Sequence, residues 1–329
     1  MIKVGLVGYG GMGHVHADSI HRINEAVLTC VCDIDVEKLK SPHEGINIDI
    51  EKKSDIFDIS NTNTYTNFKE MLAKEEIDFL IVTLPTDLHC EYSVMALESG
   101  CHVFCEKPMA LCSADCLKMI KASERTGKKI MIGQCIRFWS EYEFLEECIK
   151  NKTYGDLRSL TMERVGTYPA WSTWFMNGKR SGGAIIDLHV HDVDWARYAL
   201  GEPDKIFGAG TVGMSGRIDD STLIMQYKNC SVNIRGSWML TQDFRMTYEA
   251  IFDRATISFD PKNEPTVKIY TTESSEPEYI SLSKKSAYLK EMEYFIECIK
   301  DGKTNNKCTP SSSMEGIKVA ETEIKSIME

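Results

Sequence analysis

The segment KVGLVGYGGMG, residues 3–13, is the most informative stretch of this chain. Residues 3–7 form a short β-rich run, and GYGGMG then places Gly8, Gly10 and Gly13 at the spacing GxGxxG. A glycine string that directly follows a strand and opens a helix is typical of a dinucleotide-binding turn. We expect Gly8 to allow the tight turn, Gly10 to let a pyrophosphate approach the backbone, and Gly13 to let helix and strand pack closely. The predicted phosphate site at the helix N-terminus also includes Gly11 and Met12.

An acidic residue supports the same interpretation. Asp33 lies twenty residues after Gly13, at the end of the second β-rich run, where it would accept hydrogen bonds from an adenosine ribose. Its carboxylate repels a 2′-phosphate and neither Ile34 nor Asp35 is basic, so the sequence favours NAD over NADP. The alternative is a glycine-rich turn that binds no nucleotide, and the joint register of turn and acid argues against it.

The first third of the chain alternates β-rich and helical patterns. The β-rich runs cover residues 3–7, 27–32, 79–83 and 102–105, and the helical stretches cover residues 12–22, 68–74, 88–99 and 114–126. This alternation predicts βαβ units and therefore an α/β fold with a doubly wound parallel sheet. Residues 41–63 are polar and acidic and do not fit the alternation, and we expect them to form an extended connection.

After Lys128 the β-rich runs follow one another, which is typical of an α+β unit on an open, mainly antiparallel sheet. They cover residues 129–137, 157–167, 223–227, 231–240, 247–252, 256–259 and 267–270. One helix is expected over residues 183–200, and two more over residues 286–300 and 311–328. We therefore predict an NAD-binding domain over residues 1–128 and a substrate-binding and oligomerisation domain over residues 129–329.

Composition excludes several classes of partner. The 329 residues carry 38 basic and 49 acidic side chains, a formal charge of -11, with no basic stripe for nucleic acid or an anionic membrane. No run approaches the ~20 apolar residues of a membrane span, and the first residues do not have the pattern of a signal peptide. The twelve cysteines form no CxxC pair and are expected to be reduced, so we expect a cytoplasmic protein.

Two further segments carry ionisable side chains that could take part in catalysis. In GGAIIDLHVHDVDWARYALG, residues 182–201, helical spacing places Asp187, His191 and Asp194 on one stripe, so that Asp187 could orient His191 as a general acid or base. The alternative is a surface helix with ordinary salt-bridge acids. A zinc site at His189 and His191 is disfavoured, because residues two apart do not share a helix face, and no metal is expected.

Lys107, in the segment Glu106-Lys107-Pro108, follows a predicted strand and should lie at the carboxyl edge of the parallel sheet, where ligands bind. There it could stabilise a developing alkoxide beside a nicotinamide. The alternative is a solvated lysine before a turn proline.

Taken together, five motifs resemble those of the Gfo/Idh/MocA oxidoreductases, a family that includes inositol and sugar dehydrogenases. The motifs are GYGGMG (8–13), TLPTDLH (83–89), CEKP (105–108), GQCIRFW (133–139) and GGAIIDLHVHDVD (182–194), and the resemblance covers nearly the whole chain. It implies a Rossmann domain, a second domain with an open sheet, and NAD(P)-linked oxidation of a secondary alcohol on a sugar or cyclitol.

The resemblance also implies roles for individual residues. Lys107, Asp187 and His191 fall on catalytic positions, with His191 as the base, Asp187 as its orienting partner and Lys107 binding the hydroxyl. The residues expected along the cofactor are Thr83, Pro85, Thr86 and His89, with Glu106 and Gln134 near the nicotinamide.

Substrate and partner contacts are expected from the loop YPAWSTWFMNGKRSGG, residues 168–183. Trp171, Trp174, Asn177 and Arg180 suit the faces and hydroxyls of a sugar, although the tryptophans also suit a subunit interface. Arg137 could reach either the cofactor or the substrate. The resemblance implies a homodimer or homotetramer, and a C-terminal helix that packs back on the first domain.

Two other functions remain open within the resemblance. One is an NAD-dependent glycosidase that oxidises the sugar transiently and eliminates the aglycone, and the other is an NAD(P)-binding regulator without activity. The presence of Lys107, Asp187 and His191 favours a simple dehydrogenase.

Overall fold

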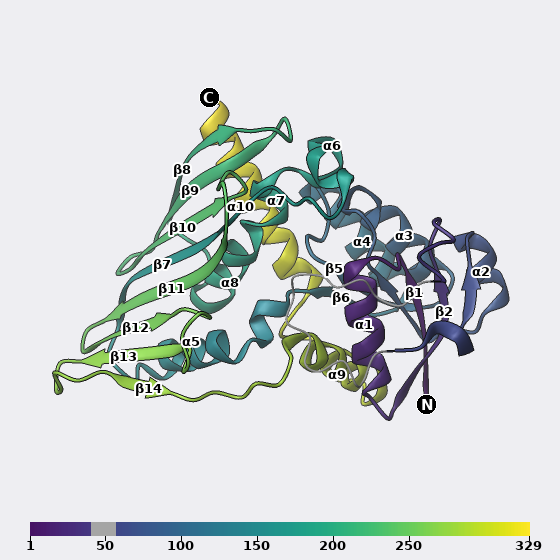
Figure 1. Cartoon of the computed structure of the whole chain (residues 1–329), viewed down its shortest axis with the longest axis horizontal. Helices are drawn as coiled ribbons and strands as arrows, with labels where there is room; N and C mark the ends of the chain where they lie inside the picture. Colours follow the sequence, from purple (N-terminus) through teal and green to yellow (C-terminus); the bar gives the residue numbers. More distant parts are fainter. Residues whose placement is uncertain (41–56) are drawn as a thin grey trace. The chain divides into compact units, whose positions relative to one another are not determined.

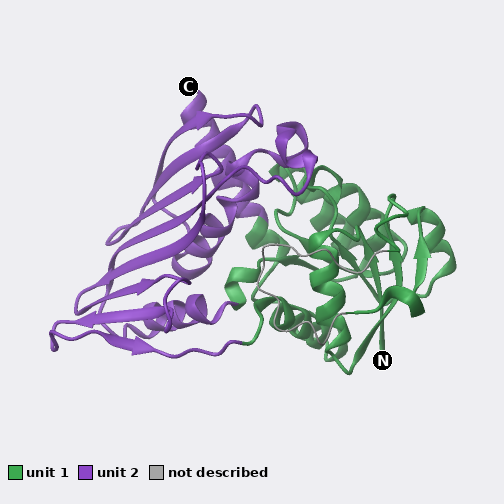
Figure 2. Ribbon diagram, viewed as in Figure 1, with its two compact units in different colours: residues 1–138, 285–313 green, residues 139–284, 314–329 purple. Residues whose placement is uncertain are grey.

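The computed structural model describes residues 1–40 and 57–329, which form two compact units (Figure 2). Unit 1 comprises Met1–Phe138 and Lys285–Ser313, and unit 2 comprises Trp139–Lys284 and Met314–Glu329. Unit 1 thus extends ten residues past the expected boundary at Lys128. It also includes the segment Lys285–Ser313, which was expected in the second domain. Most of the polar connection expected over residues 41–63 lies outside the described residues.

Unit 1 is built on a six-stranded sheet in which every pairing of neighbours is parallel, as the alternation predicts. The strand order is β3-β2-β1-β4-β5-β6, with β1 (Ile2–Val7), β2 (Ala26–Cys32), β3 (Asn63–Tyr65), β4 (Phe79–Val82), β5 (His102–Glu106) and β6 (Ile130–Gly133). The strands β4 and β6 are buried at every residue, as expected for a sheet covered on both faces.

The strand expected over residues 129–137 is wrong in its second half. Only β6 is extended, and a 3-10 helix, η3 (Cys135–Phe138), follows it at once. Because β6 pairs with β5, this segment completes the first sheet and does not begin the second.

In the described part of unit 1, the helices are α1 to α4 and α9, which Figure 1 labels. Helix α1 packs with α9, and α3 packs with α4. Local signals set their ends: the Asn67 side chain accepts a hydrogen bond from the N–H of Glu70 at the start of α2, and Gly127, with φ of 67°, ends α4. The bounds are α1 (Gly11–His21), α2 (Phe68–Lys74), α3 (Thr86–Glu98), α4 (Ser113–Thr126) and α9 (Ala287–Lys300), with a short η2 (Ile59–Asn61) before β3.

Unit 2 is built on an eight-stranded sheet of order β14-β13-β12-β11-β7-β10-β9-β8. All neighbours are antiparallel except β7 and β10, so the predicted open, mainly antiparallel sheet is confirmed. The strands are β7 (Leu157–Gly166), β8 (Lys205–Val212), β9 (Ile218–Gln226), β10 (Ser231–Ser237), β11 (Phe244–Phe252), β12 (Ala255–Phe259), β13 (Val267–Thr271) and β14 (Glu278–Ile280).

Helices cover one face of this second sheet, and no described helix lies on the other, which we call the open face (Figure 1). Helix α8 contacts β7 and β10, and α7 contacts β9 and β10. On the open face, Phe207 of β8 and Ile224 of β9 are directly opposed and are 55% and 39% exposed. The helical elements are α5 (Ser140–Asn151), η4 (Thr173–Met176), α6 (Gly178–Ser181), α7 (Ala184–Asp187), α8 (Val190–Leu200) and α10 (Pro310–Met328).

The two closing helices form where the sequence predicts them, but they have different surroundings. Helix α9 packs on α1 in unit 1. Most of α10 belongs to unit 2, where Glu323 lies 3.1 Å from His189.

All twelve cysteines are free thiols, and ten of them are buried. Among the described residues, no helix combines the length and the apolar character that crossing a membrane requires.

Candidate functional site

The glycine turn after β1 requires glycine at two positions for steric reasons. Gly8 has φ of +95°, and a Cβ there would lie 2.6 Å from the carbonyl oxygen of Thr83. A Cβ at Gly13 would lie 2.3 Å from the carbonyl oxygen of Gly8. A Cβ at Gly10, in contrast, would meet nothing within 4 Å. Gly10 therefore leaves an open approach to the backbone, as a bound pyrophosphate requires.

The start of α1 presents backbone donors beside this approach. Gly10 is the N-cap residue and supplies no side-chain cap, and Gly11 and Met12 are the first helical residues. The hydroxyl of Thr83 donates to the carbonyl oxygens of Gly8 at 2.7 Å and Val7 at 3.1 Å, which ties the turn to the end of β4. Helix N-termini with this exposure favour phosphate groups.

The turn lies at the point where the strand order of the sheet reverses, between β1 and β4. In open α/β sheets, ligands bind outside the carboxyl ends of the strands at this switch point. The predicted residues Gly8, Asp33, Thr83, Lys107 and Gln134 each follow the end of a different strand of unit 1. The structure thus brings the predicted cofactor residues to one edge.

Asp33 is buried at the end of β2 and has a fixed carboxylate. Its Oδ2 accepts from the backbone N–H of Tyr9 at 2.8 Å, and its Oδ1 accepts from that of Asp35 at 2.9 Å. The Nζ of Lys38 lies 3.7 Å from Oδ2. Lys38 was not predicted from the sequence, because Ile34 and Asp35, which directly follow Asp33, are not basic.

The loops after β4 and β5 are joined by His89. Its Nε2 lies 2.7 Å from the carbonyl oxygen of Leu84, and its Nδ1 lies 2.8 Å from that of Pro108. Burial lowers the pKa of His89, and the two carbonyl contacts oppose this effect. Pro85 precedes α3, and Thr86, its first residue, is buried. A neutral imidazole carries one N–H, so His89 donates one of these two contacts as a hydrogen bond, and its ring lies between the two loops.

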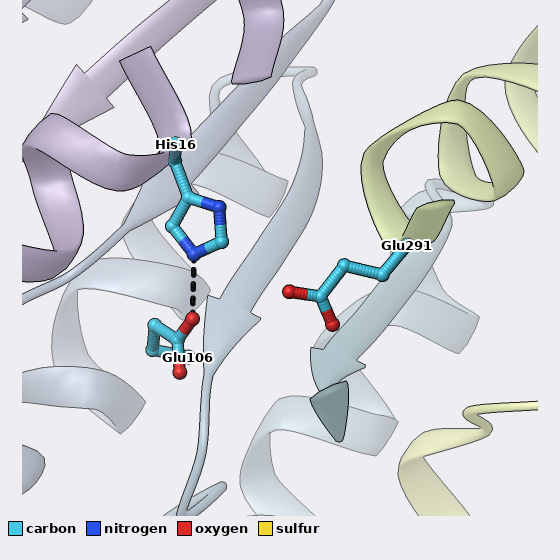
Figure 3. A group of neighbouring side chains, drawn as sticks. All are labelled: His16, Glu106 and Glu291. Atoms are coloured by element: carbon cyan, nitrogen blue, oxygen red, sulfur yellow. Dashed lines mark hydrogen bonds and ion pairs between the residues drawn. The ribbon is translucent and has the colours of Figure 1, made fainter. Parts of the chain in front are cut away.

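Lys107 is half-buried and directly follows β5. Its backbone N–H donates to Oε2 of Glu106 at 3.0 Å, and Oε1 of Glu106 lies 2.5 Å from Nε2 of His16 (Figure 3). Both oxygens of Glu106 are thus used within unit 1, and its carboxylate anchors the backbone at Lys107.

Gln134 and Arg137 are both 1% exposed and bond to the segment around the start of α10. Gln134 donates to the hydroxyl of Ser313 at 3.4 Å. Arg137 donates to the carbonyl oxygen of Lys307 and to the hydroxyl of Ser312. These contacts lie within unit 1 and fix the chain after β6.

The single helix expected over residues 183–200 is wrong, because α7 ends at Asp187 and α8 begins at Val190. The N–H of His189 bonds to the carbonyl oxygen of Ala184, five residues back, so the hydrogen-bond register slips between the two helices. The slip seats His189 against Gly236, where a Cβ would lie 2.6 Å from the Cβ of His189. Asp187 and His191 therefore stand on opposite sides of the break, 9% and 8% exposed.

The other ionisable groups of this segment serve the core of unit 2. His189 lies 3.1 Å from Glu323, and both side chains are fully buried. Asp192 accepts two hydrogen bonds from the guanidinium of Arg164, at 2.9 and 3.1 Å. The sequence interpretation missed Arg164, although it occupies an inward position of β7, where an arginine requires a buried acid.

The predicted sugar-binding loop carries a group of aromatic rings in unit 2. Trp171 is 63% exposed, and Trp174 stacks on Phe175 with ring centroids 4.0 Å apart. Asn177 accepts from the N–H of Lys179 and caps α6, and Arg180 is half-buried. The exposed indole of Trp171 is available for a ligand or a partner.

Comparison with known proteins agrees with this geometry. Residues 2–134 match the model of the GFO/IDH/MocA oxidoreductase family with an NAD-binding Rossmann fold, and residues 142–258 match the GFO/IDH/MocA C-terminal domain. The chain is 25% identical over 313 residues to a myo-inositol 2-dehydrogenase of Thermotoga maritima, which covers 92% of this chain and 89% of the relative. It is 28% identical over 206 residues to a D-glucoside 3-dehydrogenase of Escherichia coli, which covers 61% and 55%.

A solved structure shows the same fold. The WlbA dehydrogenase of Bordetella pertussis, in complex with NADH and UDP-GlcNAcA, superposes with a TM-score of 0.82 at 17% identity, over 100% of this chain and 97% of that one. The family models match both the Rossmann domain that contains the glycine turn and the C-terminal domain. The chain therefore belongs to the GFO/IDH/MocA family of NAD-binding oxidoreductases.

Proposed function

We propose that this enzyme oxidises a secondary alcohol of a sugar, cyclitol or related polyol with NAD, or carries out the reverse reduction. The observation that carries the proposal is the turn of Gly8, Gly10 and Gly13, which excludes a Cβ at two positions and leaves open space at the third. The names of the relatives, an inositol dehydrogenase and a glucoside dehydrogenase, support the substrate class.

The residues of unit 1 fit a dinucleotide. The N–H groups at the start of α1 would bind the pyrophosphate, and Asp33 would bind the adenosine ribose. Thr83, Pro85 and Thr86 would line the cofactor, with Glu106 and Gln134 near the nicotinamide. We propose that His89 contributes by holding the loops after β4 and β5 together, because both of its nitrogens already face carbonyl oxygens. When bound, the nicotinamide supplies hydride chemistry that no side chain provides.

Proton transfer is assigned to His191, Asp187 and Lys107. His191 would take the proton of the substrate hydroxyl as general base, and Asp187 would orient its ring. Lys107 would bind the hydroxyl through Nζ and stabilise negative charge as it develops on the oxygen. The anchoring of the Lys107 backbone by Glu106 supports this role, since a catalytic side chain needs a fixed origin.

NAD is proposed as the preferred cofactor. The carboxylate of Asp33 is held in place by two backbone N–H groups, so a 2′-phosphate would meet a fixed negative charge. Lys38, at 3.7 Å from Asp33, offsets part of this repulsion from an exposed position.

The substrate would contact the loop of residues 168–183. The exposed Trp171 and the half-buried Trp174 suit the C–H face of a sugar ring, and Arg180 suits its hydroxyls or a carboxylate. A role of Arg137 in substrate binding stays a prediction, because its guanidinium also bonds to Lys307 and Ser312.

We also propose that the open face of the second sheet joins copies of the chain into a dimer or tetramer. Phe207 and Ile224 form a directly opposed apolar pair on this face, and Ile251 of β11 is also exposed there. The free thiols of all twelve cysteines suit a reducing, cytoplasmic compartment.

The proposed activity is tested by NADH fluorescence of the purified protein with NAD at mildly alkaline pH. The substrates are inositols, free hexoses, sugar acids and nitrophenyl glycosides. Lys107→Ala is the inactive variant, and Lys121→Ala, an exposed lysine of α4, is the matched control. NADH formation with one substrate class, absent in Lys107→Ala alone, supports the dehydrogenase. Release of nitrophenol that needs NAD but leaves no net NADH would instead identify a redox-neutral glycosidase.

A further inference from the structure

Three ionisable side chains from distant parts of the chain meet in the interior of unit 1 (Figure 3). His16 comes from α1, Glu106 from the end of β5 and Glu291 from α9. One ligand-type atom from each lies within 4.8 Å of the others. His16 and Glu291 are fully buried and Glu106 is 5% exposed. We call these three residues the His16 cluster.

Glu291 is the unusual member of the His16 cluster. Both of its carboxylate oxygens are buried without a hydrogen-bond partner, although the carboxylate points toward His16 and Glu106 (Figure 3). The edges of two aromatic rings flank His16, with centroids at 5.1 Å for Phe104 and 6.1 Å for Tyr288. A buried carboxylate in such surroundings is strongly unfavourable unless a proton or a cation compensates its charge.

The charges of the His16 cluster also require compensation. Oε2 of Glu106 accepts from the N–H of Lys107, and Oε1 of Glu106 lies 2.5 Å from Nε2 of His16. A second carboxylate within 4.8 Å then repels the first. With both carboxylates ionised, one imidazole cannot offset two negative charges in the interior, so the cluster needs either a proton on Glu291 or a bound cation.

The donor atoms fit a small divalent cation. With one side of 2.5 Å and the others no longer than 4.8 Å, the triangle they form has a point no more than about 2.5 Å from all three corners. Bonds from Zn²⁺ to imidazole nitrogen and carboxylate oxygen are about 2.0–2.2 Å, and a tetrahedral ion places neighbouring ligand atoms about 3.3–3.6 Å apart. Nε2 of His16 and Oε1 of Glu106 would therefore separate from 2.5 Å by about 1 Å, and a water molecule would supply the fourth ligand.

We propose that the His16 cluster is a structural site for a divalent transition-metal cation, with Nε2 of His16 and one oxygen each of Glu106 and Glu291 as ligands. One nitrogen and two oxygens are a donor set that suits Zn²⁺, Fe²⁺ and Mn²⁺. The cation joins α1, β5 and α9, and it holds Glu106, whose other oxygen anchors the Lys107 backbone. The cluster shares Glu106 with the proposed cofactor site, but binding of a cation needs no sugar and no NAD, so the two proposals can be tested separately.

Binding is tested with Mn²⁺ and electron paramagnetic resonance of the full-length protein after removal of metals with EDTA. Mn²⁺ is the probe because it is paramagnetic and favours carboxylate oxygens over thiolates, whereas Zn²⁺ would also bind the twelve thiols. Binding removes the signal of free Mn²⁺, and we expect about one Mn²⁺ per chain. Affinity rises from pH 6 to pH 8, because protons compete for the ligands.

Two substitutions on one helix separate the site from general effects. Glu291→Gln keeps the shape of the side chain but removes the anionic oxygen, so Mn²⁺ affinity falls at least about tenfold. Glu293→Gln, two residues along α9, removes a carboxylate that pairs with Lys285 at the surface and leaves Mn²⁺ binding unchanged. The thermal midpoint of the wild type rises with Mn²⁺, and that of Glu291→Gln does not.

The alternative is that Glu291 is a neutral acid that shares a proton with its neighbours. Burial, with Glu106 close by, holds the pKa of Glu291 well above its usual range. In that case wild type and Glu291→Gln bind Mn²⁺ equally weakly and melt at the same temperature in EDTA, and the metal site is excluded. The wild-type protein alone also gives a decisive result, whether or not Glu291→Gln folds. If an excess of wild-type protein does not reduce the signal of free Mn²⁺, the proposal is wrong.

Discussion

The backbone N–H of Tyr9, inside the glycine turn, donates a hydrogen bond of 2.8 Å to the carboxylate of Asp33. The residue that would bind the adenosine ribose is therefore fixed to the turn that would bind the phosphates. This hydrogen bond joins two residues 24 positions apart in the sequence. It fixes the Asp33 carboxylate, on which the proposed preference for NAD over NADP depends.

The first prediction concerns that preference. Asp33→Ser combined with Ile34→Arg should shift binding from NADH toward NADPH by about tenfold to a hundredfold, because a charge-assisted hydrogen bond to the 2′-phosphate contributes about 1.5–3 kcal/mol. Dissociation constants from nicotinamide fluorescence measure the shift. Lys38→Ala is the control and should weaken NADPH binding only slightly. Wild-type protein that already prefers NADPH would show that Asp33 is misassigned.

The second prediction separates two glycines of the turn. Gly13→Ala forces a Cβ toward the carbonyl oxygen of Gly8, so it should lower the free energy of unfolding by about 1–3 kcal/mol. Gly10→Ala meets nothing in the protein, so its stability should be unchanged while NADH affinity falls. Thermal melts and NADH titrations of both variants check this. If Gly10→Ala bound NADH with wild-type affinity, the proposed pyrophosphate site at Gly10 would be wrong.

The third prediction tests the proposed base. His191→Ala should reduce turnover by a factor of about 10² or more, while NADH affinity remains near that of the wild type. Steady-state kinetics and an NADH titration give the two values. His21→Ala, at the exposed end of α1, is the control that should keep full turnover. Wild-type turnover in His191→Ala would refute the assignment.

The fourth prediction is a pH dependence of stability that comes from His189 and Glu323. Burial lowers the pKa of His189, but Glu323 and Asp192 raise it, and the net pKa lies above its usual range. The pair therefore stabilises the fold fully below the unfolded-state pKa of about 6.5, and this contribution is lost as the pH rises through the folded-state pKa.

Glu323→Gln measures this contribution. It should lower the free energy of unfolding by about 3 kcal/mol or more at pH 6, and by much less at pH 9. Denaturant melts across this range give the difference between variant and wild type. Glu315→Gln, which removes a carboxylate paired with Lys318 on α10, should show no such trend. A difference that does not change with pH would mean that His189 stays neutral throughout.

The fifth prediction concerns assembly. Ile224→Lys places a charge on the open sheet face near its β8 edge, opposite Phe207, and should convert the proposed oligomer to a smaller species. Light scattering after size-exclusion chromatography measures the mass. Val36→Lys changes an exposed apolar residue of unit 1 and should leave the mass unchanged. A wild-type monomer would contradict the proposed interface.

Most of unit 1 could be predicted from local patterns. The glycine string, the alternation of β-rich and helical runs and the acid at Asp33 are short-range features, and each reflects a backbone or burial requirement that a few neighbouring residues reveal. The parallel sheet follows from these features, whereas the second, mainly antiparallel sheet follows from the β-rich runs that succeed one another after Lys128, and the two closing helices from their helical patterns. The roles of Lys107, Asp187 and His191 rest on helical spacing, on the place of Lys107 after a strand and on the family resemblance, and they stay predictions.

Contacts between distant segments could not be predicted in this way. The break between α7 and α8 depends on Gly236 and on Glu323, which lies 134 residues from His189. The His16 cluster joins α1 to β5, 90 residues apart, and then to α9. Periodicity reports which side of an element is buried but not which polar group it meets there, because that partner is chosen by the packing of the whole unit.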